Sequence, residues 1–174
     1  MGISFLVTAY NEYEDLKKLL SQLLKIIRPT DELVIQLDNK ATNEVVQLVD
    51  DFLNKNKDNI LVKKCHFDLN KDFASFKNNA KNYCTKDWVF QIDADETLSE
   101  TFCTIIHQVL EANDEIDLIA VPRVNIVNGL EQNDVMQWGW QLNNQGWVNW
   151  PDPQHRIFRN KPEIKWVNKV HRSE

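Results

Sequence analysis

Cysteine, glycine and proline are all scarce in this chain of 174 residues, and each scarcity excludes a class of protein. The three cysteines (Cys65, Cys84 and Cys103) are odd in number and widely spaced, so they predict neither a disulfide framework nor a metal or redox motif. Four glycines and five prolines are too few for a collagen-like or linker-rich protein. These absences leave a globular domain with reduced thiols as the expected class.

Long apolar runs and an excess of positive charge are also missing. No apolar stretch is long enough to cross a bilayer, and no basic segment precedes an apolar run near Met1, so neither a membrane span nor a signal peptide is expected. The net charge of −6 and the pI of about 5.2 disfavour nucleic acid as a partner of the whole surface. We expect the protein in the cytoplasm, either free or peripheral to the inner membrane.

Positive charge gathers near the C-terminal end of this acidic chain. Residues 150–174 carry six Lys or Arg against three acids, which makes this segment +3 and the remainder −9. A basic segment on an acidic body could meet a polyanion such as a diphosphate, or it could be a solvated surface strand. Charge alone leaves both interpretations open.

Short β-rich runs alternate with helical patterns through the first two thirds of the chain. Strands are predicted at 3–8, 32–37, 60–62, 88–92 and 116–124. Apolar side chains at helical spacing predict helices around 16–27, 45–53 and 73–83, and a capping box of Thr97 with Glu100 predicts the start of a fourth. This alternation predicts an α/β domain with a mostly parallel sheet and helices on both faces.

The last third of the chain has a different texture. Asn128-Gly129 is typical of a tight turn and predicts a hairpin that joins Ile126-Val127 to Leu130. Five of the six tryptophans lie in this third, and no Ser/Gly linker separates it from the rest. We therefore expect one domain over 1–174, with a smaller mixed sheet in its C-terminal part.

The sequence Asp93-Ala94-Asp95 is the principal candidate for chemistry, because ligands of parallel sheets bind at the carboxyl ends of strands. Its two carboxylates follow a buried strand directly and can both face one point outside the sheet. Such hard oxygen ligands suit Mg²⁺ or Mn²⁺ held together with substrate phosphates. A bare acidic triplet also commonly caps a helix or lies in water.

Other polar side chains have a functional and a simpler interpretation. Asp38, at the end of the second strand, could accept a hydrogen bond from a nucleobase or ribose, or it could close an Asx turn. Glu12 could line the site or favour the following helix N-terminus. A solvated or structural role is the simpler interpretation for Lys77, Asn78, His155, Arg156 and His171.

Several ordered motifs together resemble family 2 glycosyltransferases of the GT-A fold. The matching segments are Phe5–Glu12, Val34–Asp38, Asp72–Ala80 and Trp88–Glu96. Three later segments, Val121–Arg123, Trp150–Arg159 and Trp166–His171, resemble the short bacterial branch that includes lipopolysaccharide-core β-glucosyltransferases. The resemblance covers nearly the whole chain.

The resemblance implies a Rossmann-like GT-A fold with a nucleotide-sugar-binding half (1–112) and an acceptor-side half (113–174). It implies inverting transfer of glucose or another hexose from a UDP-sugar to a hydroxyl of a glycan, a lipid-linked saccharide or another acceptor, with Mn²⁺ or Mg²⁺. The metal ligands would be Asp95, Asp93 and His171. The nucleotide-sugar contacts would be Ala9, Tyr10, Glu12, Asp38, Lys77, Asn78, Asp93, Ala94 and Arg156.

The resemblance also nominates a general base and shows departures from the family pattern. Asp152, in Trp-Pro-Asp, is the best candidate to take the proton of the acceptor hydroxyl, with Asp134 and Glu96 as rivals. Lys77 stands where the family usually has Arg, which loses a bidentate fork. Asn39–Asn43 replaces a common Ser-Thr-Asp, and Arg172 follows His171 where the branch commonly has Glu.

Other function classes stay open to different degrees. A nucleotidyltransferase would be expected to carry a glycine-rich loop after the first strand, and Thr8–Glu12 has no glycine. A phosphatase of the Asp-x-Asp type needs its acidic pair after the first strand rather than the fourth. A non-catalytic nucleotide-sugar-binding module and a glycosyltransferase acting on modified DNA bases remain as alternatives.

Overall fold

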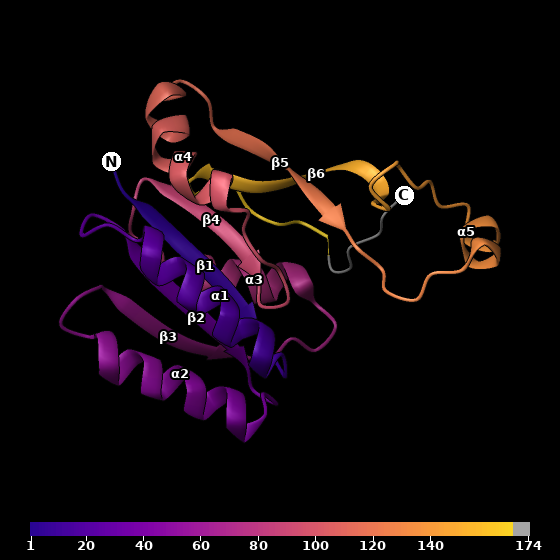
Figure 1. Cartoon of the computed structure of the whole chain (residues 1–174). Helices are drawn as coiled ribbons and strands as arrows, with labels where there is room; N and C mark the ends of the chain where they lie inside the picture. The colour runs from indigo at the N-terminus through magenta and orange to yellow at the C-terminus, as the bar shows by residue number, and fades with distance from the viewer. Residues whose placement is uncertain (169–174) are drawn as a thin grey trace.

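A computed structural model describes residues 1–168. Its six strands are β1 (Ile3–Ala9), β2 (Glu32–Asp38), β3 (Val62–Phe67), β4 (Trp88–Asp93), β5 (Leu118–Asn125) and β6 (Val148–Arg159). Its helices are α1 (Tyr13–Ile26), α2 (Asn43–Asn56), α3 (Phe73–Lys81), α4 (Glu100–Ala112) and α5 (Gln132–Trp138) (Figure 1). Within residues 1–168, no helix combines the length and the apolar character needed to span a bilayer.

The strands form one sheet in the order β3-β2-β1-β4-β6-β5. The first four strands are parallel, and β6 and β5 complete the sheet as antiparallel neighbours. The chain winds outward from β1 to β3 and then returns to place β4 on the other side of β1. The predicted α/β class is confirmed, and the reversal between β1 and β4 is the position where such sheets bind ligands.

The two faces of the sheet bury different kinds of side chain. On one face Phe5, Val7 and Phe90 join the large apolar cluster formed with α1, α2 and α4. On the other face Leu6, Val34 and other residues pack in a small cluster with α3 and the segment that follows β6. Alternation along each strand sorts the residues, because successive side chains point to opposite faces.

Polar side chains occupy much of the face that α3 covers. Glu32 is fully buried there and accepts hydrogen bonds from Ser4 Oγ (2.6 Å), Lys63 Nζ (2.7 Å) and both the amide and the hydroxyl of Thr85. Burial by itself would raise the pKa of Glu32, but these donors outweigh it and hold the pKa below its ordinary value. This carboxylate therefore joins β2 to β1, to β3 and to the turn before β4.

Two expected element boundaries were wrong. The third strand was predicted at 60–62 but lies at Val62–Phe67, because Lys63 and Lys64 are accommodated at the sheet edge by ion pairs with Glu32 and Asp50. The fourth helix was expected to begin with a Thr97–Glu100 capping box. It begins two residues later, where Ser99 is the N-cap and its Oγ accepts a hydrogen bond from the amide of Phe102 (3.2 Å).

The C-terminal part also differs from the expectation. The hairpin predicted at Asn128-Gly129 is absent from the described residues: Gly129 lies in a turn, but β5 pairs with the distant β6 instead. The smaller mixed sheet is likewise not separate, since β5 and β6 extend the main sheet. Figure 1 shows this strand pair extending away from the body of the domain, with α5, which the sequence did not predict, at its far end.

We predict that Glu32→Gln lowers the free energy of unfolding by about 2–3 kcal/mol, because the neutral amide weakens the charge-assisted hydrogen bonds around it. Urea denaturation followed by circular dichroism measures the change. Glu14→Gln removes an exposed carboxylate from the first turn of α1; it is the matched control and should cost less than about 1 kcal/mol. A loss for Glu32→Gln no larger than that of the control would contradict the structural role of this carboxylate.

Candidate functional site

The carboxylate of Asp93 lies at the reversal point of the sheet. Asp93 ends β4 and is the register partner of Thr8 on β1. Its Oδ1 accepts hydrogen bonds from Thr8 Oγ1 (2.9 Å) and Gln91 Nε2 (2.7 Å), while the amide of Ala94 donates to the carbonyl of Thr8 (3.0 Å). The first carboxylate of the acidic pair is thus held inside the strand ends rather than free in a loop.

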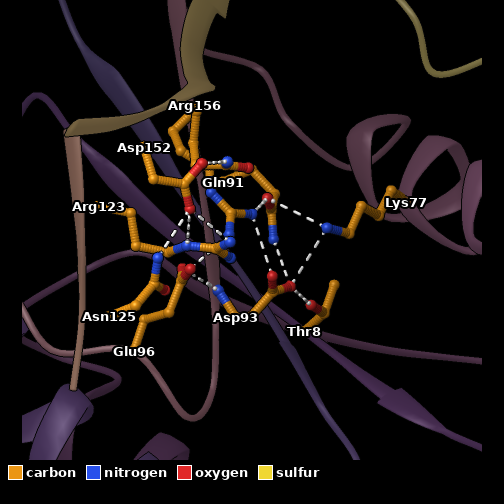
Figure 2. A network of polar contacts seen from close by, with 10 residues as sticks. Thr8, Lys77, Gln91, Asp93, Glu96, Arg123, Asn125, Asp152 and Arg156 are labelled. Atoms are coloured by element: carbon orange, nitrogen blue, oxygen red, sulfur yellow. Dashed lines mark hydrogen bonds and ion pairs between the residues drawn. The ribbon is translucent and has the colours of Figure 1, made fainter. Parts of the chain in front are cut away.

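Two cations from other parts of the chain converge on this carboxylate (Figure 2). Lys77 Nζ, from α3, lies 3.3 Å from Asp93 Oδ1, and Arg156 Nη1, from β6, donates to Oδ2 at 3.0 Å. Burial would raise the pKa of Asp93, but the charges of Lys77 and Arg156 and the bonds from Thr8 and Gln91 bring it down to about 2. Asp93 is therefore ionised at every physiological pH.

Lys77 lies in the interior and not on a solvated face of α3. Only 3% of its surface is exposed, and its ammonium also contacts Gln91 Oε1 (3.3 Å). Burial lowers the pKa of Lys77, and the neighbouring charge of Arg156 lowers it further, while Asp93 opposes both. The solvated-face interpretation of this residue was wrong.

An irregularity in β6 accounts for the inward direction of Arg156. Ile119 pairs with Ile157 and Ala120 pairs with His155, so Arg156 is the extra residue of a β-bulge. Bulges redirect side chains and are common beside functional sites. The buried guanidinium contacts Asp93, Gln91 and Glu96 together.

Glu96 completes this buried cluster. Its Oε1 pairs with Arg156, and its Oε2 accepts the amide hydrogen bond of Asp93 (3.0 Å). Burial raises the pKa of Glu96; Arg156 opposes this rise and the nearby charge of Asp93 adds to it. The carboxylates of Asp93 and Glu96 thus share one guanidinium but have pKa values displaced in opposite directions.

Asp95 is arranged differently from Asp93. It is exposed, and its side chain makes no hydrogen bond or ion pair with any residue in 1–168. No cluster of three or more His, Cys, Asp or Glu suited to a metal exists among the same residues. One exposed carboxylate fits a Mg²⁺ or Mn²⁺ ion whose other ligands are substrate phosphates and water. Asp93, already held by two cations, does not fit as a direct ligand, and His171 lies outside the described residues.

Asp38 and Glu12 are occupied by local hydrogen bonds. Asp38 accepts from the amides of Lys40 (2.7 Å) and Leu69 (2.8 Å), so it forms the Asx turn given as its simpler interpretation and also fastens the loop after β3. Glu12 Oε2 accepts from the amides of Tyr10 (2.8 Å) and Asn11 (3.0 Å). Both carboxylates shape the loops at the carboxyl ends of β1 and β2.

The other expected donor-side residues lie around the same strand ends. Ala9 and Ala94 are buried and Tyr10 is exposed in the loop after β1. Asn78 exchanges two hydrogen bonds with the backbone of Trp166 (2.8 and 3.0 Å) and so holds the segment after β6 against α3. The structure therefore gives Asn78 a fastening role between segments far apart in the sequence.

Asp152 lies on β6 within a second polar cluster (Figure 2). Its carboxylate accepts from Arg123 Nη2 (2.7 Å), Asn125 Nδ2 (3.0 Å) and Gln154 Nε2 (2.7 Å). Burial would raise its pKa, but these donors hold the pKa below its ordinary value. The rival Asp134 belongs to α5, where it accepts the amide hydrogen bond of Glu131 (3.1 Å) in a capping box.

Sequence reasoning missed Thr8, Gln91 and Arg123 as members of these clusters. Each is a polar residue within an otherwise apolar strand, at a position where alternation places its side chain on one face of the sheet. The basic C-terminal segment also proves partly neutralised, since Arg156, Arg159 and Lys161 pair with Asp93, Asp114 and Asp117. Three of the six cations counted in residues 150–174 are therefore engaged by carboxylates of the same chain.

We predict that Asp93→Asn destabilises the fold by about 3 kcal/mol, because it leaves Lys77 and Arg156 buried without their counter-ion. The pKa of Asp93 is lower folded, at about 2, than its ordinary value of 3.8, so its stabilisation is complete above pH 4 and is lost as pH falls toward 2. In the Asp93→Asn variant, the free energy of unfolding should therefore fall less between pH 4 and pH 2 than it does in the wild type. Asp95→Asn is the control, with no expected loss of stability. Equal stability of both variants would contradict the clamp, by which we mean the two ion pairs that hold Asp93 between Lys77 and Arg156.

Solved structures of other proteins share the fold of this chain. A structure of S. aureus TarS 1-349 in complex with UDP-GlcNAc is 17% identical, covers 92% of this chain and 46% of its own, and has a TM-score of 0.61. The Pyrobaculum calidifontis mannosyltransferase PcManGT, in complex with GDP-Man and Mn²⁺, is 18% identical over 70% of this chain and 35% of its own, with a TM-score of 0.57. The chain thus spans about half the length of the TarS structures.

The fold alone does not separate these proteins from a synthase of a different name. The 4-diphosphocytidyl-2C-methyl-D-erythritol synthase of Anaerococcus prevotii is 11% identical, covers 96% of this chain and 78% of its own, and also has a TM-score of 0.57. No curated protein matches the chain. The family model described as "Glycosyl transferase family 2" matches residues 4–168, which is almost the whole sequence, and the chain belongs to this family.

Proposed function

We propose that this chain transfers a hexose from a UDP-sugar to an acceptor hydroxyl, with inversion at the anomeric carbon and with Mn²⁺ or Mg²⁺. The observation that supports it best is the contrast between the two carboxylates of Asp93-Ala94-Asp95. One is clamped by two buried cations at the reversal point of the sheet, and the other is exposed without a partner among residues 1–168. Membership of glycosyl transferase family 2 supports the reaction class.

On the donor side, residues 1–112 would bind the nucleotide-sugar. Asp95 would hold the metal together with the diphosphate, and the metal would neutralise charge on the departing UDP. Tyr10, exposed after β1, lies in a loop shaped by Glu12 and is free to contact the nucleotide. Asp38 holds the neighbouring loop in place, and its carboxylate oxygens retain lone pairs for a ribose or base contact.

On the acceptor side, residues 113–174 would supply the base. The acceptor oxygen attacks the anomeric carbon, its proton passes to a carboxylate, and the bond from that carbon to the UDP oxygen breaks on the opposite face. We assign this role to Asp152, because it is ionised, partly exposed and held in place by Arg123 and Asn125 of β5. Asp152 also lies on β6, the strand that carries Arg156. Glu96 is the rival, because it lies beside Asp93 and has a raised pKa.

A non-catalytic nucleotide-sugar-binding module is the main alternative. Release of free UDP from UDP-glucose with Mn²⁺, compared with and without EDTA, separates an enzyme from a module. Radiolabelled UDP-glucose with a panel of saccharides, lipid-linked glycans and hydroxymethylated DNA then identifies the acceptor class. The pairing of Arg156, Arg159 and Lys161 with Asp93, Asp114 and Asp117 disfavours DNA, since these three cations are already engaged by carboxylates of the protein.

We predict that Asp95→Asn abolishes the part of UDP affinity that depends on Mn²⁺, because its carboxylate is the protein's exposed metal ligand. Isothermal titration of UDP with Mn²⁺ and with EDTA measures this part. Mn²⁺ without UDP should bind weakly to the wild-type protein, because Asp95 is the one carboxylate of the acidic pair without a partner among residues 1–168, and one carboxylate supplies few of the ligands that the ion needs.

Asp58→Asn is the matched control for this titration. Asp58 is also exposed and follows α2, so it lies at the opposite edge of the sheet from the carboxyl ends of the strands. Its loss should leave both titrations unchanged. Equal affinity of Asp95→Asn and wild type for UDP with Mn²⁺ would remove Asp95 from the metal site.

A second prediction concerns the general base. Asp152→Asn should lower kcat by at least about 100-fold with UDP affinity unchanged, since general bases contribute factors of this size. Hydrogen-bond donors hold the pKa of Asp152 below its ordinary value despite burial, and burial holds that of Glu96 above its ordinary value, so the base leaves a signature in the pH profile of kcat/KM. An acid limb that Glu96→Gln leaves unchanged supports Asp152. An acid limb that is lost in Glu96→Gln would transfer the role to Glu96.

A further inference from the structure

The segment that runs from the end of β5 through most of β6 has an unusual composition. Residues 124–155, which we call the arm, contain four Trp and eleven Asn or Gln but no Lys or Arg, although the whole chain has 20 Lys and Arg. Three acids and one His complete its charged or titratable side chains. Figure 1 shows the arm extending away from the sheet with α5 at its end.

The tryptophans of the arm form two pairs. Trp138 and Trp140 have ring centroids 4.8 Å apart at an interplanar angle of 53°, and Trp147 and Trp150 are 4.9 Å apart at 65°. In each pair one indole is half-buried and supports an outer one that is exposed: Trp138 by 52% and Trp150 by 39%. Two exposed aromatic faces are thus held in position by a second ring.

Backbone hydrogen bonds fix the loop that carries these rings. The amide of Asn149 donates to the carbonyl of Gln141 (2.7 Å), and Asn149 Oδ1 accepts from the amide of Gln141 (2.9 Å). Asn143 Oδ1 likewise accepts from the amide of Trp147 (2.9 Å). A surface ordered in this way loses little conformational entropy when it binds a ligand.

We propose that the arm binds a neutral oligosaccharide, and that this glycan is the acceptor. Indole faces stack on the C–H faces of pyranose rings, and exposed amides both donate to and accept from sugar hydroxyls. The absence of Lys and Arg from the arm argues against anionic lipids and nucleic acids, which require cations. This inference deepens the proposed function and rests on it, because the inner end of the arm carries Asp152, the proposed base.

The position of the arm supports this assignment. Asp152, near the inner end of the arm, pairs through its carboxylate with Arg123 of β5, and four residues further along β6 Arg156 pairs with Asp93. A glycan laid along the exposed indoles would therefore end beside the proposed base. Donor and acceptor would then meet at the point where the arm joins the sheet.

Tryptophan fluorescence titrations of the full chain test the proposal with hexasaccharides of glucose, mannose and N-acetylglucosamine. At least one should bind, with an affinity that is independent of salt because the ligand is neutral. Trp138→Ala should weaken that binding by about ten-fold, the loss of one stacking contact, and Trp138→Phe should recover most of it. Tyr83→Ala removes an aromatic side chain of similar exposure (43%) on another surface and is the matched control.

UDP titration of the same variants separates the two proposals. Glycan binding lost in Trp138→Ala with UDP affinity retained supports the arm as the acceptor surface. Binding of no hexasaccharide, or equal binding by Trp138→Ala and wild type, would overturn it while leaving UDP binding to judge the donor site. Binding to phosphatidylglycerol vesicles or single-stranded DNA instead of glycans, or a dimer in sedimentation that Trp138→Ala dissociates, would overturn it in favour of another occupant.

Discussion

The ion pairs of Asp93 with Lys77 and Arg156 are the contact on which the arrangement of the site depends. They join β4 to α3 and to β6, and the hydrogen bond from Thr8 adds β1. Four secondary-structure elements, from β1 near the start of the chain to β6 near its end, therefore meet at one carboxylate. Because its partners are buried cations, that carboxylate must stay charged, and each segment is held where its charge is compensated.

This clamp separates the duties of two acids that the sequence presents as equivalent. Asp93 ends the strand and faces the α3 side, where two cations satisfy it. Asp95 lies beyond the strand end, in water, and has no such partner among residues 1–168. Within residues 1–168, a metal ion carrying a diphosphate would meet one unpaired carboxylate of this acidic pair, so its affinity would depend on the nucleotide. We therefore expect donor and metal to bind together.

The sequence predicted the fold class well and the partners of the site residues poorly. Alternating strand and helix periods are local signals, and they located β1, β2 and β4 almost to the residue. The pairing of Arg156 with Asp93 depends on a β-bulge and on a sheet neighbour 63 residues away, for which no local pattern exists. The Asn128-Gly129 turn signal was genuine, but turn chemistry does not determine which strands pair. Lys77 looked solvated because its counter-ion is not on its own helix.

The distribution of charge is such that the donor would be recognised by charged side chains and the acceptor by aromatic stacking and neutral hydrogen bonds. Buried cations and carboxylates concentrate where β1, β4 and β6 meet, in surroundings where water screens them weakly. The arm, which ends on β6 beside Arg156, offers indole faces and amides and contains no Lys or Arg. A charged donor and a neutral acceptor would each find one complementary surface and little attraction to the other. If both proposals hold, specificity follows from this division, because a polyanionic acceptor would lack cations on the arm and a neutral glycan would form no ion pair at the charged strand ends.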